Sequence, residues 1–200
     1  GRQIFGSSYQ WHKNGYQNRI LSTVSHSAYI KIADGCNHRC TFCAIPGFKG
    51  PYRSRPVTEI VREARSLSRR CFRELILVAQ DTTAYGTDLE GHINLAHLLK
   101  KLIRIDRLKW IRVLYAHPSH ITGELIDMIA GEEKICRYLD MPLQHISDPV
   151  LKAMGRGLRR KQIERLIEPI RSRVPDIVLR TAFIPGFPGV WRHTRALQII

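Results

Sequence analysis

Short aliphatic runs alternate with amphipathic segments along most of this chain. The aliphatic runs are rich in β-branched residues, which is typical of strands that are buried on both faces of a parallel sheet. Each run is followed by a helical pattern, and this alternation predicts parallel βα units joined by right-handed crossovers. The five expected strands are Ala28–Ile32, Glu74–Ala79, Trp110–Ala116, Arg137–Pro142 and Ile177–Ile184.

Apolar residues recur at helical spacing between the expected strands. Thr122 is expected to cap the third helix, since a threonine hydroxyl can accept a hydrogen bond from the first turn. Pro169 lies inside the last pattern and is expected to kink that helix, because proline removes a backbone donor. The expected helices cover Val57–Leu67, Leu95–Leu102, Leu125–Ile129, a short segment that starts at Ser147 or Asp148, and Ile163–Val174.

This order of elements predicts an α/β fold, a partial parallel (β/α) barrel with about five strands. In barrels of this kind the chemistry lies at the carboxyl ends of the strands. Polar or glycine-rich residues follow each expected strand and should therefore meet at one rim. They are the cysteines of segment 36–43, then 80–83, His117, Gln144 with His145, and 185–189.

Composition and net charge indicate which partners and which cellular location to expect. The chain has 200 residues, a hydrophobic share of 44% and a net charge of +15, which favours contact with nucleic acid or a ribonucleoprotein. Segment 151–175 carries eight basic residues against two acidic ones, which indicates either a solvated helix face or a surface for RNA. The sequence shows no apolar run long enough for a membrane span and no signal-peptide pattern, so we expect a cytoplasmic protein without a membrane partner.

Three of the five cysteines, Cys36, Cys40 and Cys43, form a C-x3-C-x2-C motif. Thiolates are soft ligands that suit iron–sulfur clusters and zinc, and three of them can hold three corners of a four-iron cluster. The remaining iron would then be open to a substrate or cofactor. Zinc bound with His38 or His26 is the alternative, whereas an odd number of cysteines argues against disulfides. The isolated Cys71 and Cys136 are expected to be packed residues.

The motif, with Phe42 just before the last cysteine, resembles the signature of the radical S-adenosylmethionine (SAM) superfamily. The resemblance implies that the three cysteines hold a 4Fe–4S cluster whose unique iron is chelated by the amino and carboxylate groups of SAM. It also makes Phe42 a candidate contact to SAM.

Further SAM contacts are expected where the later strands end. Gln80 and Asp81 can accept hydrogen bonds from the methionine ammonium, although a loop that caps the next element is the plainer reading. Gln144 can hold a ribose hydroxyl through its amide. Arg180 lies in an apolar strand and must be paired, either with the SAM carboxylate or in a salt bridge. Gly186 allows close backbone approach to adenine.

From about Arg19 to Gly189 the chain looks like the radical SAM domain of the methylthiotransferases. The RimO-type branch modifies an aspartate of a small-subunit ribosomal protein, and the MiaB-type branch modifies a tRNA adenosine. Segments 79–86 and 143–148 resemble the RimO type. The matching stretches are Tyr29–Cys36, Ser54–Pro56, Pro142–Gln144 and Phe183–Gly189.

This resemblance implies a reaction that uses the cluster, a 5′-deoxyadenosyl radical, and an electron donor such as flavodoxin or ferredoxin. The family carries a second 4Fe–4S cluster in an amino-terminal domain that we do not find here, and its barrel has a sixth strand that we do not find either. We therefore expect a linker at 1–27, a truncated radical SAM domain at 28–189 and an atypical tail at 190–200. The alternatives are a MiaB-type enzyme or a non-catalytic basic metal-binding module that docks on RNA.

Overall fold

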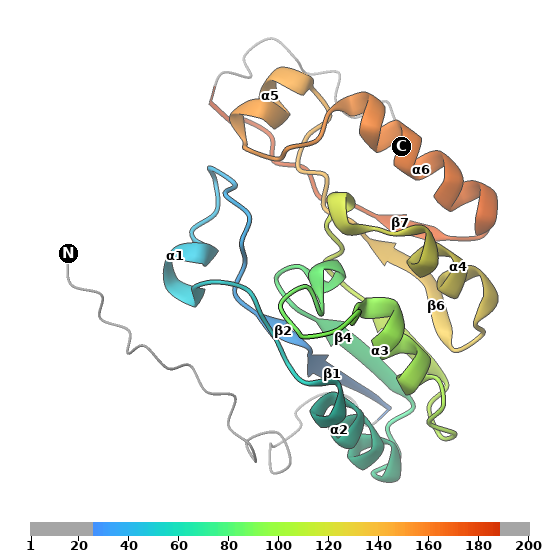
Figure 1. The fold of residues 1–200 in the computed structure, drawn as a ribbon. Helices are drawn as coiled ribbons and strands as arrows, with labels where there is room; N and C mark the ends of the chain where they lie inside the picture. Colours follow the sequence, from blue (N-terminus) through green and yellow to red (C-terminus); the bar gives the residue numbers. More distant parts are fainter. Residues whose placement is uncertain (1–25, 189–200) are drawn as a thin grey trace.

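The computed structural model describes residues 26–188 (Figure 1). The tail expected at 190–200 and nearly all of the linker expected at 1–27 lie outside these residues. Ser27, which we had assigned to the linker, begins the first strand.

Five parallel strands form the main sheet of the described part, in the order β1-β4-β5-β6-β7. Each strand lies beside the next one in the chain, as in successive units of a (β/α) barrel, so the predicted fold class is confirmed. Strands β5 and β7 end sooner than the apolar runs had predicted. The bounds are β1 Ser27–Lys31, β4 Glu74–Val78, β5 Trp110–Val113, β6 Ile135–Asp140 and β7 Val178–Arg180.

The predicted helices connect these strands (Figure 1). Helix α2 packs on β1 and α4 packs on β6, while α2, α3, α4 and α6 pack against their neighbours in sequence order. The Thr122 hydroxyl accepts a hydrogen bond from the Leu125 N–H and caps α4, as expected. Helix α6 continues through Pro169. The bounds are α2 Val57–Arg69, α3 Leu95–Leu102, α4 Gly123–Gly131, α5 Asp148–Ala153 and α6 Arg160–Arg173.

A small structure that periodicity did not predict precedes α2. Strands β2 (Ala33–Asp34) and β3 (Arg53–Ser54) pair in antiparallel fashion, and the short helix α1 (Ile45–Lys49) lies between them. Segment 35–44, the cysteine loop, leaves β2 and enters α1. The β2–β3 pair therefore fixes both ends of the excursion that carries the three cysteines.

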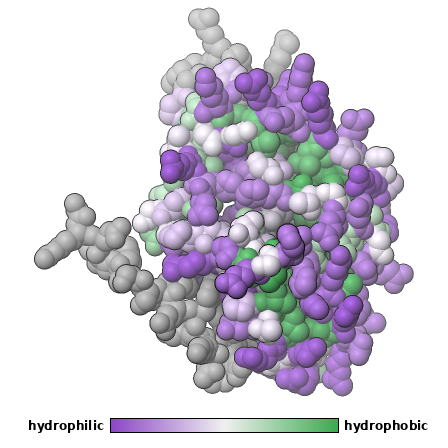
Figure 2. Space-filling model, viewed as in Figure 1, coloured by the Kyte–Doolittle hydropathy of each residue, from purple (hydrophilic) through white to green (hydrophobic). Residues whose placement is uncertain are grey.

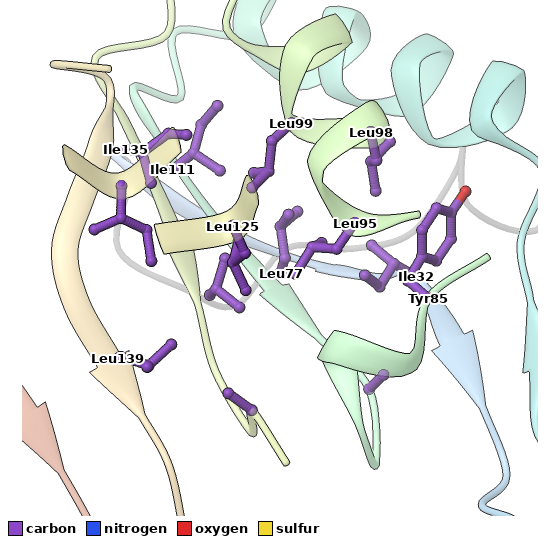
Figure 3. Packing of buried hydrophobic residues seen from close by; sticks show 14 of the residues in the cluster. Ile32, Leu77, Tyr85, Leu95, Leu98, Leu99, Ile111, Leu125, Ile135 and Leu139 are labelled. Atoms are coloured by element: carbon purple, nitrogen blue, oxygen red, sulfur yellow. The ribbon is translucent and has the colours of Figure 1, made fainter. Parts of the chain in front are cut away.

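The hydrophobic core lies between the sheet and its helices. Figure 3 shows Leu95, Leu98 and Leu99 of α3 directed toward sheet residues such as Leu77. The visible surface is mainly hydrophilic, with apolar patches of limited extent (Figure 2). Among residues 26–188, no helix is both long and apolar enough to cross a membrane.

One buried ion pair interrupts this core. Arg55 Nη1 donates to Glu63 Oε2 of α2 at 2.8 Å and to the Lys31 carbonyl of β1 at 2.7 Å. The two side chains are only 1% and 4% exposed. Tyr85, itself fully buried, donates its hydroxyl to the Arg55 carbonyl at 2.7 Å. The pair thus ties helix α2, through Glu63, to the first strand, through the Lys31 carbonyl.

Candidate metal and cofactor site

The three motif cysteines lie together on the cysteine loop, each partly exposed and with a free thiol. Burial raises the pKa of Cys36 although a backbone hydrogen bond from His38 lowers it, and the charges of Asp81, Cys40 and Cys43 raise it further. The amide of Cys43 donates to the Cys40 carbonyl at 3.0 Å and closes a tight turn between two of them. Three soft donors on one short loop form a set that fits a metal cluster.

The near end of the cysteine loop is fixed by backbone contacts. Gly35 has φ +76°, and a Cβ at this position would lie 2.1 Å from the Pro51 carbonyl oxygen. The amide of Cys36 donates to the Gly50 carbonyl at 3.2 Å. The side-chain oxygen of Asn37 accepts a hydrogen bond from the Tyr52 amide at 2.9 Å. Only glycine fits at position 35, because both the space and the conformation exclude a side chain.

The far end of the loop is held by the turn after α5. The amide and the hydroxyl of Thr41 donate to the carbonyls of Met154 and Ala153, both at 3.0 Å. At Gly155, a Cβ would lie 2.8 Å from the Arg39 carbonyl oxygen. The two segments are therefore in close backbone contact although they lie more than a hundred residues apart.

Arg156 joins this contact with its side chain. Its guanidinium donates to the Pro142 carbonyl at 2.8 Å and lies 3.7 Å from the Cys40 Sγ. Arg156 is buried, so it does not belong to the exposed basic face that we had predicted for segment 151–175. The other seven basic residues of that segment are exposed, and Arg160 is paired with Glu164 at 2.7 Å. A buried cation beside a thiolate stabilises negative charge on the sulfur.

Asp81 follows β4, as predicted, and lies at the centre of a polar cluster. Its Oδ2 contacts His38 Nε2 at 2.8 Å and His120 Nδ1 at 2.7 Å. Its Oδ1 accepts hydrogen bonds from the Thr83 hydroxyl at 2.7 Å and the Ala84 amide at 3.1 Å. Burial alone would raise the pKa of Asp81, but the hydrogen bonds from His120, His38 and Thr83 outweigh it and hold the pKa well below its ordinary value. Asp81 is therefore a buried carboxylate anion.

His117 completes this arrangement from the end of β5. Its ring stacks on that of His38, with 3.9 Å between centroids, and its Nδ1 accepts a long 3.3 Å hydrogen bond from the Ser119 amide. Burial, helped by the charge of Arg156, lowers the pKa of His117 to about 3, so the ring is neutral. The Asp81 hydrogen bond raises the pKa of His120. We call the group the histidine–aspartate cluster: His38, Asp81, His117 and His120.

Sequence reasoning found this cluster only in part. It placed Asp81 and His117 at strand ends but did not select His120. It named His38 as an alternative zinc ligand beside the cysteines, whereas the structure pairs it with Asp81. The available signal was the spacing of two histidines, 117 and 120, after a strand whose neighbour ends in an aspartate.

The remaining predicted residues lie on the cysteine loop or on segments that follow strands β4, β6 and β7. Gln80 has a buried Oε1 without a hydrogen-bond partner within the described residues. Gln144 adopts φ +71° and forms an isolated parallel bridge with Phe183. Gly186 adopts φ +72° with open space above it, and Phe42 is 36% exposed. These positions suit ligand contacts.

The structure gives a partner for the Arg180 side chain. Its guanidinium donates to Asp140 Oδ1 at 2.7 Å, which is the salt bridge that we had given as one alternative. Asp140 is 1% exposed, but the Arg180 side chain is 57% exposed and therefore not in the core. A contact between Arg180 and a SAM carboxylate stays a prediction.

Comparison with known proteins gives the family. Residues 30–195 match the family model described as the radical SAM superfamily. The chain belongs to the radical SAM superfamily. Within that superfamily, the fold is similar to that of the radical SAM methyltransferase TsrM from Kitasatospora setae with tryptophan substrate and a SAM analogue bound. The TM-score is 0.64 at 21% identity, over 82% of this chain and 31% of that chain.

Curated relatives share a higher sequence identity with this radical SAM domain than that structure does. It is 53% identical over 171 residues to the ribosomal protein uS12 methylthiotransferase RimO of Elusimicrobium minutum, which is 86% of this chain and 40% of that protein. It is 54% identical to the protein of the same name from Clostridium botulinum, over 86% of this chain and 38% of the relative. The chain thus spans about two fifths of the length of these curated relatives.

Proposed function

We propose that this chain is the radical SAM domain of a RimO-type methylthiotransferase, which adds a methylthio group to an aspartate of the small-subunit ribosomal protein uS12. The observation that carries the proposal is about 50% identity to relatives of that name over most of this chain, cysteine loop included.

Cys36, Cys40 and Cys43 would hold a 4Fe–4S cluster. The fit rests on three neighbouring free thiols on one loop, anchored at both ends and accompanied by the buried Arg156. When bound and reduced, such a cluster supplies the electron for reductive cleavage of SAM. Cys71 and Cys136 lie at the end of α2 and on β6, outside this loop, and are not expected to be ligands.

SAM would bind at the carboxyl ends of the strands, beside the cysteine loop. Gln80 suits the methionine ammonium best, because its buried carbonyl oxygen has no hydrogen-bond partner among residues 26–188, whereas the Asp81 oxygens already accept several hydrogen bonds. Asp81 would then act by fixing His38 and, through it, the loop. The proposed direct SAM contacts are Phe42, Gln80, Gln144, Arg180 and Gly186, and Asp81, which was predicted as a contact, is assigned the indirect role.

The partners follow from the same assignment. The exposed basic residues of α5 and α6 would face ribosomal RNA near the protein substrate, since phosphate contacts need exposed cations. We expect a cytoplasmic location, where ribosomal proteins are made. An external electron donor of the flavodoxin or ferredoxin class would reduce the cluster. A second 4Fe–4S cluster, as a sulfur source, would be held by residues outside this chain.

Anaerobic reconstitution with iron and sulfide tests the cofactor assignment. We expect one four-iron cluster per chain, lost in a Cys36→Ala, Cys40→Ala, Cys43→Ala variant and kept in the matched Cys71→Ala, Cys136→Ala variant. Addition of SAM should change the electron paramagnetic resonance spectrum of the reduced cluster. Equal iron content in the two variants, or a spectrum indifferent to SAM, would refute the assignment.

A chimera tests the substrate. Residues 26–188 of this chain would replace the matching segment of the Elusimicrobium minutum relative, and the product would be incubated with SAM, reductant, small ribosomal subunits and tRNA. We expect mass spectrometry to find the methylthio group on an aspartate of uS12. A methylthio group found on tRNA instead would contradict the proposed substrate.

A further inference from the structure

We propose that the histidine–aspartate cluster is a binding site for one divalent transition-metal ion such as Zn²⁺, distinct from the site formed by the cysteines. One ligand atom from each of its four residues lies within 4.8 Å of all the others. The residues converge from three segments, namely the cysteine loop, the end of β4 and the turn after β5. The inference does not depend on methylthio transfer.

The donor set selects the class of ion. Three imidazole nitrogens are borderline ligands that suit Zn²⁺, Fe²⁺ and Co²⁺, and a carboxylate oxygen commonly completes such a set. Mg²⁺ and Ca²⁺ prefer sites made of oxygen ligands. Four donors also match the coordination number of zinc in proteins. The chemistry of the cluster therefore points to zinc or a similar ion.

The ring of His117 supplies a second, independent indication. His117 is 7% exposed, and its Nε2 is a buried atom without a hydrogen-bond partner within the described residues. Buried polar atoms normally have hydrogen-bond partners, so the unsatisfied Nε2 is explained if it binds an ion. An ion on Nε2 would place the ring hydrogen on Nδ1, at the expense of only the long contact with the Ser119 amide.

The carboxylate of Asp81 is already oriented for such a role. Hydrogen bonds from the Thr83 hydroxyl and the Ala84 amide hold Oδ1, and they leave Oδ2 toward His38 and His120. Outer-shell contacts of this kind orient metal ligands in known sites. The bound ion would replace the two hydrogens between the histidines and Oδ2, and each would move to the other ring nitrogen or leave as a proton to solvent.

The site also has an entry path. The side chains of His38 and His120 are 26% and 38% exposed, whereas that of Asp81 is 2% exposed. An ion can therefore approach from the side of the two histidines and meet the buried carboxylate at the bottom. A protein metal site needs such a path as well as its ligands.

Titration with Co²⁺ tests the proposal. The whole chain would carry Cys36→Ser, Cys40→Ser and Cys43→Ser, so that no motif thiolate competes, and intense thiolate-to-cobalt absorption would reveal any residual sulfur ligand. We expect one ion per chain with the visible bands of tetrahedral nitrogen and oxygen coordination. His120→Ala should weaken binding by more than about 100-fold, because it removes a direct ligand. The matched control His92→Ala, at an exposed histidine outside the cluster, should change nothing.

Absence of Co²⁺ binding by the serine variant, with a native circular dichroism spectrum, would overturn the proposal. Equal affinities in the His120→Ala and His92→Ala variants would overturn it too. If the serine variant does not fold, the chain with all its cysteines gives the answer: His120→Ala should lower the number of bound Zn²⁺ ions by one, and an unchanged number would refute the site. Loss of the iron–sulfur cluster alone leaves these expectations unaltered.

Discussion

Removal of Glu63 from the buried ion pair should be among the most damaging single changes in this chain. Glu63→Leu would leave the Arg55 guanidinium, with its side chain 1% exposed, without the carboxylate that now lies 2.8 Å away. Breaking one side of a buried pair typically costs about 3–5 kcal/mol, because the remaining charge stays buried. Replacement of both partners by apolar residues of similar size is often nearly neutral. The double variant Arg55→Met, Glu63→Leu should therefore be more stable than Glu63→Leu alone.

Urea unfolding of the metal-free chain, followed by circular dichroism under reducing conditions, measures both effects. With a slope of about 3 kcal/mol per M, near the top of the usual range for urea, the loss corresponds to a midpoint lower by roughly 1–2 M. Glu63→Gln keeps the shape of the side chain and serves if Glu63→Leu does not fold. Glu164→Gln breaks the exposed Arg160–Glu164 pair and is the matched control, with an expected change below about 0.5 kcal/mol.

The reasoning would be refuted by a double variant no more stable than Glu63→Leu, since the damage would then not come from an unpaired charge. It would also fail if Glu63→Gln and the surface control Glu164→Gln shifted the midpoint equally. A fully buried pair and an exposed pair must differ if burial decides the cost.

Two further changes probe the cysteine loop. Gly35→Ala should reduce the iron content after reconstitution, since the new Cβ would lie 2.1 Å from the Pro51 carbonyl oxygen, whereas Gly47→Ala meets nothing within 4 Å and should keep it. Arg156→Met should lower the reduction potential of a cluster held there, because it removes a cation 3.7 Å from the Cys40 sulfur. Arg156→Lys keeps the charge and should leave the potential close to that of the unchanged chain. A redox titration followed by electron paramagnetic resonance measures both potentials. An unchanged iron content in the first case, or an unchanged potential in the second, would contradict the expectation.

The fold was predictable because the spacing of apolar residues shows which face of each helix or strand is buried, and the buried faces pack together to form the sheet and its helical layer. Strand ends were less predictable. The predicted third strand ran to Ala116, yet β5 ends at Val113, because Tyr115 adopts φ +59° and takes the backbone out of the extended conformation. Strands β2 and β3 have two residues each, which is too short for any period to appear.

The candidate site was predictable where chemistry is local in sequence, as in the cysteine motif. Asp81 could be placed at a strand end, but its partners His38 and His120 lie 43 and 39 residues away. No local sequence pattern predicts contacts over such separations. Arg156 was misread for the same reason. Its position in a basic segment indicates solvent exposure, and only the approach of α5 to the cysteine loop buries it.

The distant anchorage of the cysteine loop has a consequence for how this protein is made. The contacts of Thr41 with Ala153 and of Cys40 with Arg156 span 112 and 116 residues. At a translation rate of about 5–20 residues per second, the thiols leave the ribosome roughly 5–20 s before the turn that anchors their loop. During that interval they are exposed to oxidants and to any free metal in the cell. The cysteine loop therefore reaches its final shape only after the turn that follows α5 has been synthesised, and a cofactor that needs this shape binds after that point.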